Sequence, residues 1–364
     1  MSIPWWTVQT VGSELDNLKL VLDSGYLNEG QIATNFEKRL SEIFGVTNVV
    51  VTTSGTAALF LALKSAGIRP GDLVGVPNLT FIATASAVKL AGGDVLLLDV
   101  DPVSMTVSND EILRAKRNGV KAIIPVHVSG RSAWNEELQQ VLLENEIVVI
   151  EDAAEAMGSK DPTTGKHLGT IGHAGIFSFS PNKVITTGQG GALLTNDDPL
   201  ARNARSLKDQ GRPVRGTGGA DRHDLEGYNF KFTNIQSAIG ISQLEDLEKR
   251  IMFLTDLYDS YRKAIYDCEH QRLLPFSTKA GEFPLWPEIS FKNKKEALNK
   301  LDEAGIGYRE IWHPISTQKP YFSTHPFPNS TALSESTIWL PSSFQLSSDQ
   351  VTTITKTLEC EICQ

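Results

Sequence analysis

The sequence predicts an α/β protein with a mostly parallel mixed sheet flanked by helices and a smaller α+β domain towards the C-terminus. From residue 49 onward, short apolar runs alternate with helical segments, a pattern typical of right-handed crossovers between parallel strands. At 364 residues, the chain exceeds the length at which a single core usually divides. We therefore expect a large domain over residues 1–250 and a small one over residues 251–364.

The N-terminal segment is predicted to be helical. Leu15, Leu18 and Leu22 recur at helical spacing and would form the apolar side of an amphipathic helix. A second helix is expected over "ATNFEKRLSEIF", before the strands begin.

Five apolar runs are expected to be strands, and a helix is expected after each of the first four. These strands are "VVVTTSGT", "LVGVP", "DVLLLDV", "KAIIPVHV" and "IVVIEDAA". Residues 227–267 then predict one or two long connecting helices. In the small domain, the sequence predicts a strand in "EFPLWPEISF" and helices in "KKEALNKLDEAG" and "SSDQVTTITKTLE".

Ligands of parallel sheets collect beyond the carboxyl ends of the strands, and two polar motifs follow strand ends here. The segment Thr52–Thr56 begins a helix, where unpaired N–H groups and the helix dipole favour an anion such as phosphate. A plain capped helix start is the alternative. Glu151 and Asp152 are expected at the rim of the sheet, where an acid leaving an apolar strand needs a partner such as a protonated pyridine nitrogen. An Asp that caps the next turn is the alternative.

Lys183 lies between the apolar run "AGIFSF" and the glycine-rich turn "TGQGG". An amine held out of water there titrates low and becomes a nucleophile. Such a lysine suits a Schiff base to pyridoxal phosphate, provided that other segments bind the ring nitrogen and the phosphate. Alone, it would more often be a solvated side chain.

Composition and charge limit the function classes. The net charge is −9, with 34 basic and 43 acidic residues scattered along the chain, which disfavours nucleic-acid binding. No run approaches the ~18 apolar residues of a membrane span, and the N-terminus does not resemble a secretory signal, so we expect no membrane partner and a cytoplasmic location. Residues 211–227 predict a loop, basic at Arg212 and Arg215, which would either grip a polyanionic substrate or be solvated.

In this order, "TTSGT", "IEDAAEAMGS" and "FSFSPNKVITTGQGGALLTND" resemble the DegT/DnrJ/EryC1/StrS family of sugar aminotransferases. These are pyridoxal-phosphate enzymes of fold type I, the aspartate-aminotransferase type. The resemblance covers nearly the full length, since "SGTAALFLALKSAGIRPGD", "VPNLTFIATASAVKLAGGDVLLLDVDP", "GYNFKFTNIQSAIGISQLEDLE" and "WHP" also match in order.

The resemblance implies a role for each matching residue. Lys183 would carry the cofactor and then act as general acid and base, and Asp152 would keep the pyridine nitrogen protonated. Asn229 would reach the phosphate in the neighbouring subunit, which implies a homodimer with shared active sites. The other implied cofactor contacts are Ser54, Gly55 and Thr56 with Ser178 at the phosphate, Phe81 stacked on the ring, and Glu155 beside the cofactor. His313 and, as a weaker candidate, Arg309 would lie near the sugar or its diphosphate.

The sequence also departs from the family pattern. Glu155 stands where many relatives have Gln or His, although the perosamine-synthase branch looks similar. "VHVSGR" replaces a commoner "VHLYGQ" pattern, so Ser129 and Arg131 are not expected to contact substrate. Family dehydratases replace the lysine by histidine, whereas Lys183 is retained here.

The resemblance therefore predicts transfer of an amino group from L-glutamate to a nucleotide-linked keto-deoxysugar. The segments "PNKVITTGQGG" and "NFKFTNIQSAIGISQLE" are most similar to perosamine synthases, which act at the 4-position of a GDP sugar during synthesis of cell-surface polysaccharide. A sugar dehydratase or lyase on the same fold is one alternative. A protein that keeps the cofactor site as a ligand sensor is another.

Overall fold

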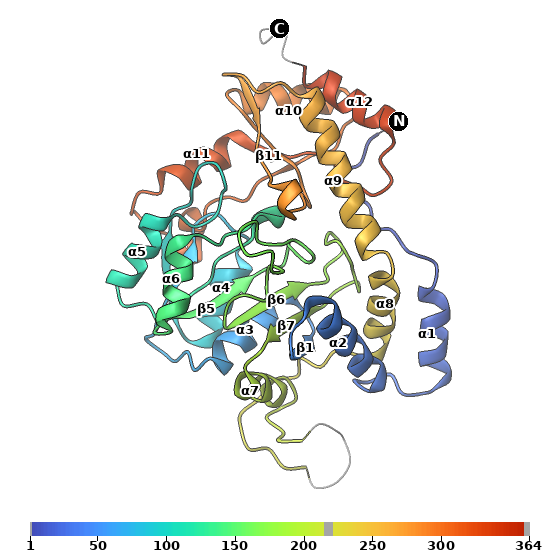
Figure 1. Cartoon of the computed structure of the whole chain (residues 1–364), viewed down its shortest axis with the longest axis vertical. Coiled ribbons are helices and arrows are strands. Elements are labelled where there is room, and N and C mark those ends of the chain that lie inside the picture. Colours follow the sequence, from blue (N-terminus) through green and yellow to red (C-terminus); the bar gives the residue numbers. More distant parts are fainter. Residues whose placement is uncertain (1, 215–220, 360–364) are drawn as a thin grey trace.

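The computed structural model describes residues 2–214 and 221–359 and divides into two lobes (Figure 1). Within these residues, the large lobe holds a seven-stranded sheet in the order β1-β7-β6-β5-β4-β2-β3. Neighbouring strands pair in parallel from β6 to β3, and β7 is antiparallel to both β1 and β6. The predicted α/β fold with a mostly parallel sheet is confirmed.

In the large lobe, the first five strands and the helices between them alternate as the sequence predicts. Its strands are β1 (Asn48–Thr52), β2 (Leu73–Pro77), β3 (Asp94–Leu98), β4 (Ala122–Ile123), β5 (Val148–Asp152), β6 (Ala174–Ser178) and β7 (Gly191–Thr195). Its helices are α1 (Glu14–Asp23), α2 (Gln31–Phe44), α3 (Gly55–Ser65), α4 (Ala83–Ala91), α5 (Asn109–Arg117), α6 (Glu136–Glu144), α7 (Asp198–Lys208) and α8 (Asn234–Leu244), with a 3-10 turn at Val128–Gly130.

Apolar side chains on both faces explain why the sheet is buried between helices. In β1, Val50 packs with α3, α4 and α7, whereas Val49 and Val51 belong to the core that includes α2. Successive residues of a strand point to opposite faces, so an unbroken apolar run is what two covered faces require.

Strand β6 is absent from the prediction, and so is the antiparallel strand β7. Strand β7 begins at Gly191, where a Cβ atom would lie 2.5 Å from the backbone of Ser54 and Gly55. Only glycine permits this approach, and it brings the start of β7 against the start of α3. Because β7 follows a glycine-rich turn and is only five residues long, its pairing depends on contacts far away in the sequence.

The small lobe is built on an antiparallel sheet in the order β10-β11-β9-β8. Its elements are α9 (Leu247–Ala264), β8 (Gln271–Leu273), β9 (Glu288–Phe291), α10 (Lys294–Glu303), β10 (Arg309–Glu310), α11 (Pro328–Ser336), β11 (Thr337–Trp339) and α12 (Ser348–Thr357), with 3-10 turns at Thr278–Ala280, Ile315–Thr317 and Lys319–Tyr321. Ile3 also pairs with Ile306 of this lobe. The division at residue 250, which falls within α9, stays a prediction.

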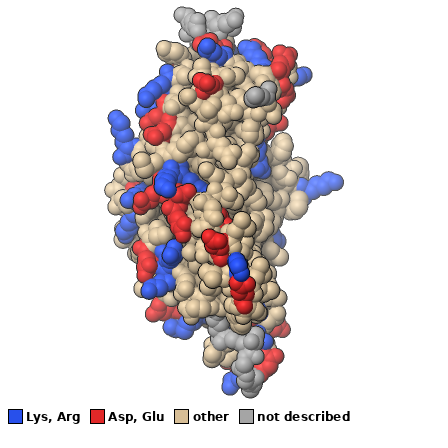
Figure 2. All heavy atoms as spheres, turned by 90° about the vertical axis from the view of Figure 1, so that its right-hand side faces the viewer, with Lys and Arg blue, Asp and Glu red and all other residues tan. Residues whose placement is uncertain are grey.

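The predicted packing of the first helix is wrong. α1 packs on α8, but Leu15 and Leu22 are exposed and Val21 is the buried apolar residue. The leucine spacing correctly indicates a helix, yet periodicity does not say which side a neighbour covers. On the face turned towards the viewer in Figure 2, acidic and basic side chains are interspersed around an uncharged band. Among the described residues, no helix is both long and apolar enough to cross a membrane.

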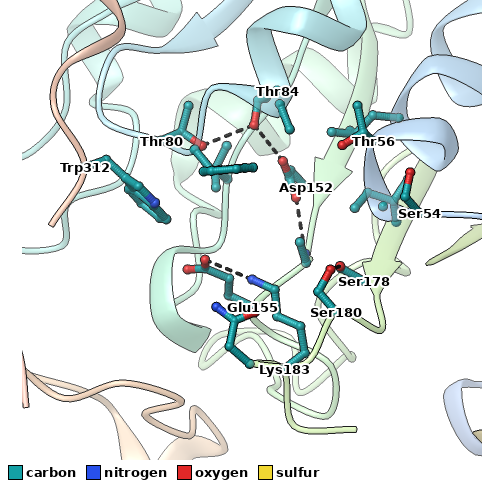
Figure 3. Close-up of a pocket in the computed structure, with 18 of the residues that line it drawn as sticks. Ser54, Thr56, Thr80, Thr84, Asp152, Glu155, Ser178, Ser180, Lys183 and Trp312 are labelled. Atoms are coloured by element: carbon teal, nitrogen blue, oxygen red, sulfur yellow. Dashed lines mark hydrogen bonds and ion pairs between the residues drawn. The ribbon is translucent and has the colours of Figure 1, made fainter. Parts of the chain in front are cut away.

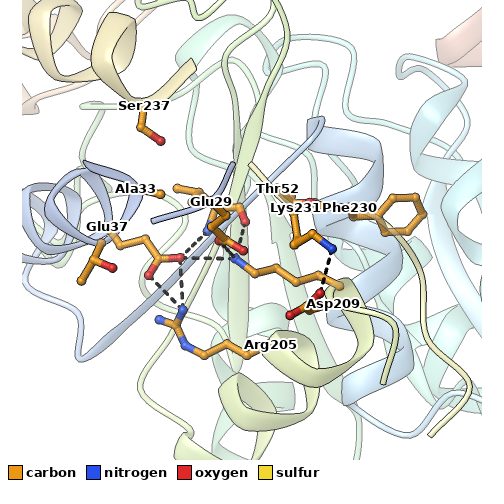
Figure 4. A network of polar contacts seen from close by, with 12 residues as sticks. Glu29, Ala33, Glu37, Thr52, Arg205, Asp209, Phe230, Lys231 and Ser237 are labelled. Carbon is orange, nitrogen blue, oxygen red and sulfur yellow. Dashed lines mark hydrogen bonds and ion pairs between the residues drawn. The ribbon is translucent and has the colours of Figure 1, made fainter. Parts of the chain in front are cut away.

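A buried ionic network joins α2, β1 and α7 (Figure 4). Glu37 accepts from Arg205 at 2.9 Å, and Lys208 donates to Glu29 at 2.6 Å. The next residue, Asp209, forms an ion pair with Lys231 at 2.8 Å. The network therefore fixes the end of α7 and the returning segment that carries Asn229.

We expect Lys208→Met to destabilise the protein by about 3–5 kcal/mol, because it removes the ammonium group that lies against the buried carboxylate of Glu29. Lys208 is 2 % exposed, and its ammonium group also donates to the carbonyl of Val51. The matched control is Lys19→Met, which breaks an exposed pair with Asp23 and should cost at most about 1 kcal/mol. Urea unfolding checks both variants, and equal shifts in midpoint would contradict this assignment.

Candidate active site

A cavity of about 300 Å³ lies between the lobes, at the carboxyl ends of β5 and β6 and the starts of α3 and α4. Its position obeys the strand-end rule for parallel sheets. The cavity is lined by Ser54, Gly55, Thr56, Leu59, Thr80, Phe81, Ala83, Thr84, Val126, Asp152, Ala154, Glu155, Ile176, Ser178, Ser180, Asn182, Lys183, Gln189, Trp286, Arg309, Trp312 and Trp339.

Lys183 projects into this cavity from the loop after β6 (Figure 3). Its side chain is 12 % exposed, and its Nζ lies 3.2 Å from Oε1 of Glu155 and 4.8 Å from the centre of the Trp286 ring. The carboxylate and the indole face both stabilise a cation at this position. The amine is thus held at a defined point, largely out of water.

Asp152 ends β5 and is buried beside the start of α4. Its Oδ2 accepts from Oγ1 of Thr84 at 2.8 Å, and its Oδ1 accepts from the N–H of Ala154 at 3.2 Å (Figure 3). Burial raises the pKa of Asp152, because these two hydrogen bonds and the charge of Lys183 compensate only in part for the lost hydration. A buried acid in this condition suits a cationic partner such as a pyridinium nitrogen.

Glu155 links Lys183 to the backbone on the other side of the cavity. Its Oε2 accepts from the N–H of Ser129 at 3.0 Å, while its Oε1 faces the amine. Burial raises the pKa of Glu155, and the nearby ammonium group of Lys183 opposes this shift. Glu155 and Lys183 therefore form an ion pair that is largely removed from water.

The start of α3 forms a concave site for an anion. Oγ of Ser54 caps the helix by accepting from the N–H of Ala57 at 3.1 Å, and the first turn of a helix leaves further N–H groups without partners inside the helix. A Cβ atom on Gly55 would lie 3.0 Å from Cβ of Ser178, so glycine lets the helix start approach that hydroxyl group. Thr56 and Ser180 add hydroxyl groups to the same wall (Figure 3). A phosphate fits this arrangement.

Glu151 does not lie at the rim, as its place at a strand end had suggested, but is completely buried. Its Oε2 accepts from Nε2 of His127 at 2.9 Å and from the indole N–H of Trp134 at 2.8 Å. Nδ1 of His127 accepts from the N–H of Ala133, which places the ring proton on Nε2. Burial opposes the charge of Glu151, but hydrogen bonds from His127 and from backbone N–H groups including that of Gly172 outweigh it and lower its pKa.

The segment that carries His127 also holds the backbone of Asp152 in place. The N–H of His127 donates to the carbonyl of Asp152 at 3.0 Å, and the N–H of Asp152 donates to the carbonyl of Pro125 at 2.9 Å. His127 and the inward direction of Glu151 were not predicted from the sequence. Their contact could have been inferred from the segments "VHV" and "IED", which follow neighbouring strands and pair with each other.

The cavity brings together most of the residues that the sequence predicts for the site. It contains Ser54, Gly55, Thr56, Phe81, Asp152, Glu155, Ser178, Lys183 and Arg309. His313 is exposed and does not line the cavity, and Asn229 lies away from it and pairs with Asp209. Five further lining residues were not predicted from the sequence, although three Trp residues in one lobe were a signal: Thr80, Thr84, Trp286, Trp312 and Trp339.

The fold and this cavity define the class of the protein. A lysine at the end of one strand, a buried acid at the end of the next and an anion site at a helix start fit the aldehyde, the ring nitrogen and the phosphate of pyridoxal phosphate. The protein therefore has a site that fits pyridoxal phosphate at the strand ends of an α/β fold.

Comparison with known proteins gives its family. The model of the DegT/DnrJ/EryC1/StrS aminotransferase family matches residues 9–359, and the chain belongs to this family. It is 33 % identical over 320 residues to the GDP-perosamine synthase of Caulobacter vibrioides, and the aligned region covers 85 % of this chain and 84 % of that protein. It is also 33 % identical over 362 residues to the GDP-perosamine synthase of Escherichia coli O157:H7, which covers 96 % and 95 %.

A solved structure supports the fold. The crystal structure of a DegT DnrJ EryC1 StrS aminotransferase from Brucella abortus superimposes with a TM-score of 0.87 at 28 % identity, covering 95 % of this chain and 94 % of that one. The predicted family and fold type are thus confirmed.

We expect Asp152→Asn to stabilise the cofactor-free protein and to lower turnover of the loaded enzyme by several orders of magnitude. Because its pKa is raised, Asp152 binds a proton more tightly in the folded protein than in the unfolded chain, so cofactor-free stability falls as the pH rises through that pKa. Asparagine removes this pH dependence, and a neutral amide cannot hold the ring nitrogen protonated.

Thermal unfolding at several pH values, with and without pyridoxal phosphate, tests this trade-off. Asp256→Asn on the exposed side of α9 is the control and should change neither property. Near-normal turnover of Asp152→Asn would remove Asp152 from this role, and a cofactor-free variant less stable than the wild type would contradict the argument from burial.

Proposed function

We propose that this enzyme transfers the amino group of L-glutamate to the keto carbon of a nucleotide-linked 4-keto-6-deoxyhexose, as a GDP-perosamine synthase does. The observation that carries the proposal is the 33 % identity to a GDP-perosamine synthase over 96 % of the chain. Lys183 at the centre of the cavity supports transamination over dehydration, because the family dehydratases have histidine there.

Each group of the cavity has a task in this reaction. When bound, pyridoxal phosphate supplies an electron sink for the carbon that loses its proton. Lys183 would hold the aldehyde and, once released, would carry a proton at Nζ. Asp152 would hold the ring nitrogen in its protonated form, and the start of α3 would bind the phosphate. Glu155, 3.2 Å from Nζ, stabilises the ammonium form of Lys183 whenever the amine is free.

The aromatic residues of the small lobe keep water out of the site. Trp286 and Trp339 are completely buried, and Trp312 packs on Trp339 with its ring centre 5.0 Å away. In such a site, charged groups act on one another more strongly than in water. Trp286, Trp312 and Trp339 therefore give the cavity an apolar wall on the side of the small lobe.

We also propose that the enzyme is a homodimer with shared sites. Asn229 points to this arrangement because it lies outside the cavity of its own chain, on the segment that follows Asp209. Symmetric dimers place the same residue of each subunit at the other's site. In this arrangement Asn229 donates to the cofactor phosphate of its neighbour.

A screen of GDP-, UDP- and dTDP-linked 3- and 4-ketosugars tests the proposed substrate. We expect the GDP-linked 4-keto-6-deoxyhexose to give a product in which an amino group replaces the keto oxygen, with one 2-oxoglutarate released per product. Mass spectrometry reads the sugar and an enzyme-coupled assay reads the keto acid. Lys183→Ala is the control and should form neither. Loss of water from the sugar without consumption of glutamate would instead favour a dehydratase.

Mixing two inactive variants tests the shared site. Lys183→Ala and Asn229→Ala are each expected to be impaired, but in a mixed dimer one site combines an intact Lys183 with an intact Asn229. Subunit exchange should therefore restore roughly a quarter of wild-type activity if each site uses both chains. A mixture no more active than the better variant would show that Asn229 acts within its own chain or not at all.

A further inference from the structure

Ser129 lies in the 3-10 turn Val128–Gly130, and Arg131 follows it directly. Neither residue was expected to contact substrate, yet both are buried. We propose that Ser129 is a positioning residue, which holds the carboxylate of Glu155 against Lys183 and is itself anchored to the small lobe. The inference rests on the proposed role of Lys183 and concerns a residue behind the wall of the cavity.

The backbone of Ser129 connects the cofactor site with the small lobe. Its φ of 51° lies in the left-handed region, which a residue with a side chain keeps only where surrounding contacts hold it. In this conformation the N–H of Ser129 donates to Oε2 of Glu155 at 3.0 Å. Its carbonyl accepts from the N–H of Leu285, in the small lobe, at 2.9 Å. The donor to Glu155 is therefore fixed from the opposite lobe.

The hydroxyl group of Ser129 makes a second contact with the small lobe. Its Oγ accepts from the indole N–H of Trp339 at 3.0 Å, and the same N–H lies 3.1 Å from Oε1 of Glu288. Oε2 of Glu288 in turn lies 2.8 Å from Nη2 of Arg131. Because Arg131 comes directly after the turn, these contacts form a closed circuit that leaves the turn little freedom to move.

Arg131 fastens the turn further and is not available to an anionic ligand. Its Nε donates to the carbonyl of Pro275 at 2.8 Å, and its guanidinium carbon lies 3.6 Å from the centre of the Phe276 ring. The side chains of Arg131 and Glu288 are both buried, so each charge depends on the other for compensation. The ion pair between them therefore holds the turn and the small lobe together.

Glu155 depends on this anchoring because few groups stabilise its charge. Burial raises the pKa of Glu155, and the ammonium group of Lys183 and the N–H of Ser129 oppose this shift. A donor on a freely moving turn would not stay in place, so the contacts of Ser129 determine how well the carboxylate is held 3.2 Å from Nζ of Lys183. Ser129 thereby stabilises the ammonium form of Lys183 without touching it.

Acetylation of the full-length, cofactor-free protein tests the proposal, because only an uncharged amine reacts. After a short pulse of acetic anhydride at a fixed, mildly alkaline pH, peptide mass spectrometry gives the acetylation of Lys183 relative to that of the exposed Lys19. We expect Glu155→Gln to raise this ratio roughly tenfold or more, since a nearby opposite charge favours the charged amine. Ser129→Gly removes the hydroxyl group and frees the backbone, and should raise it about three- to tenfold.

A double-mutant cycle distinguishes positioning from a general opening of the site. If Ser129 acts through Glu155, combining Ser129→Gly with Glu155→Gln should give no higher ratio than Glu155→Gln alone. Trp339→Phe keeps an aromatic ring but removes the N–H that contacts Ser129, so it should also raise the ratio. Asn145→Gly is the matched control, because Asn145 has a φ of 55° at the end of α6 and does not line the cavity. Its ratio should equal that of the wild type.

Two results would overturn the inference. One is an unchanged ratio in Ser129→Gly, or in Trp339→Phe if the first variant does not fold, which would leave the turn with a role in stability alone. The other is an equal increase with and without Glu155, which would mean that the substitution merely opens the site. These measurements require neither the cofactor nor a substrate, so the role of Ser129 can fail while transamination is confirmed, and the reverse.

Discussion

The burial of the Asp152 carboxyl group is the constraint on which the site depends. An acid at the end of β5 loses its hydration, and Thr84 and one backbone N–H restore only part of what water supplied. The carboxylate of Asp152 is therefore fully stabilised only when a cation lies against it. The neighbouring carboxylate of Glu151, in contrast, accepts hydrogen bonds from His127, Trp134 and the N–H of Ile171. Glu151 is therefore stabilised within the protein, whereas Asp152 has fewer hydrogen-bond donors around it.

Glu151 and Asp152 are neighbouring carboxylic acids whose surroundings give them different roles. Glu151 is deeper than Asp152, yet its pKa is lowered, because His127, Trp134 and several backbone N–H groups donate to it. Asp152 has fewer donors, and its pKa is raised. The first is suited to hold two strand ends in register, and the second to respond to a ligand. Glu151, which accepts many hydrogen bonds, thus stabilises the fold, and the adjacent Asp152, which accepts few, is left available for a ligand.

The sequence predicts those parts of the structure that depend on local pattern. Alternating strands and helices give the sheet, and the strand-end rule alone brings the start of α3, Asp152 and the loop of Lys183 to one edge. Features that depend on distant contacts were missed or misjudged. The start of β7 depends on the close approach of Gly191 to Ser54. The cluster of Trp residues beside the cavity depends on contact between Trp5 and Trp286 of the small lobe. The outward direction of Leu15 likewise depends on which helix covers α1.

The pairing of Ile3 with the small lobe has a consequence for how the chain folds. The N–H of Ile3 donates to the carbonyl of Gly305, and the carbonyl of Ile3 accepts from Gly307, so the earliest residues to leave the ribosome are joined to residues synthesised some three hundred positions later. Contacts of such sequence separation form late, since a large loop must close first. Trp5, whose ring lies against Trp286 and Trp339, therefore cannot reach its native contacts until the small lobe has been synthesised.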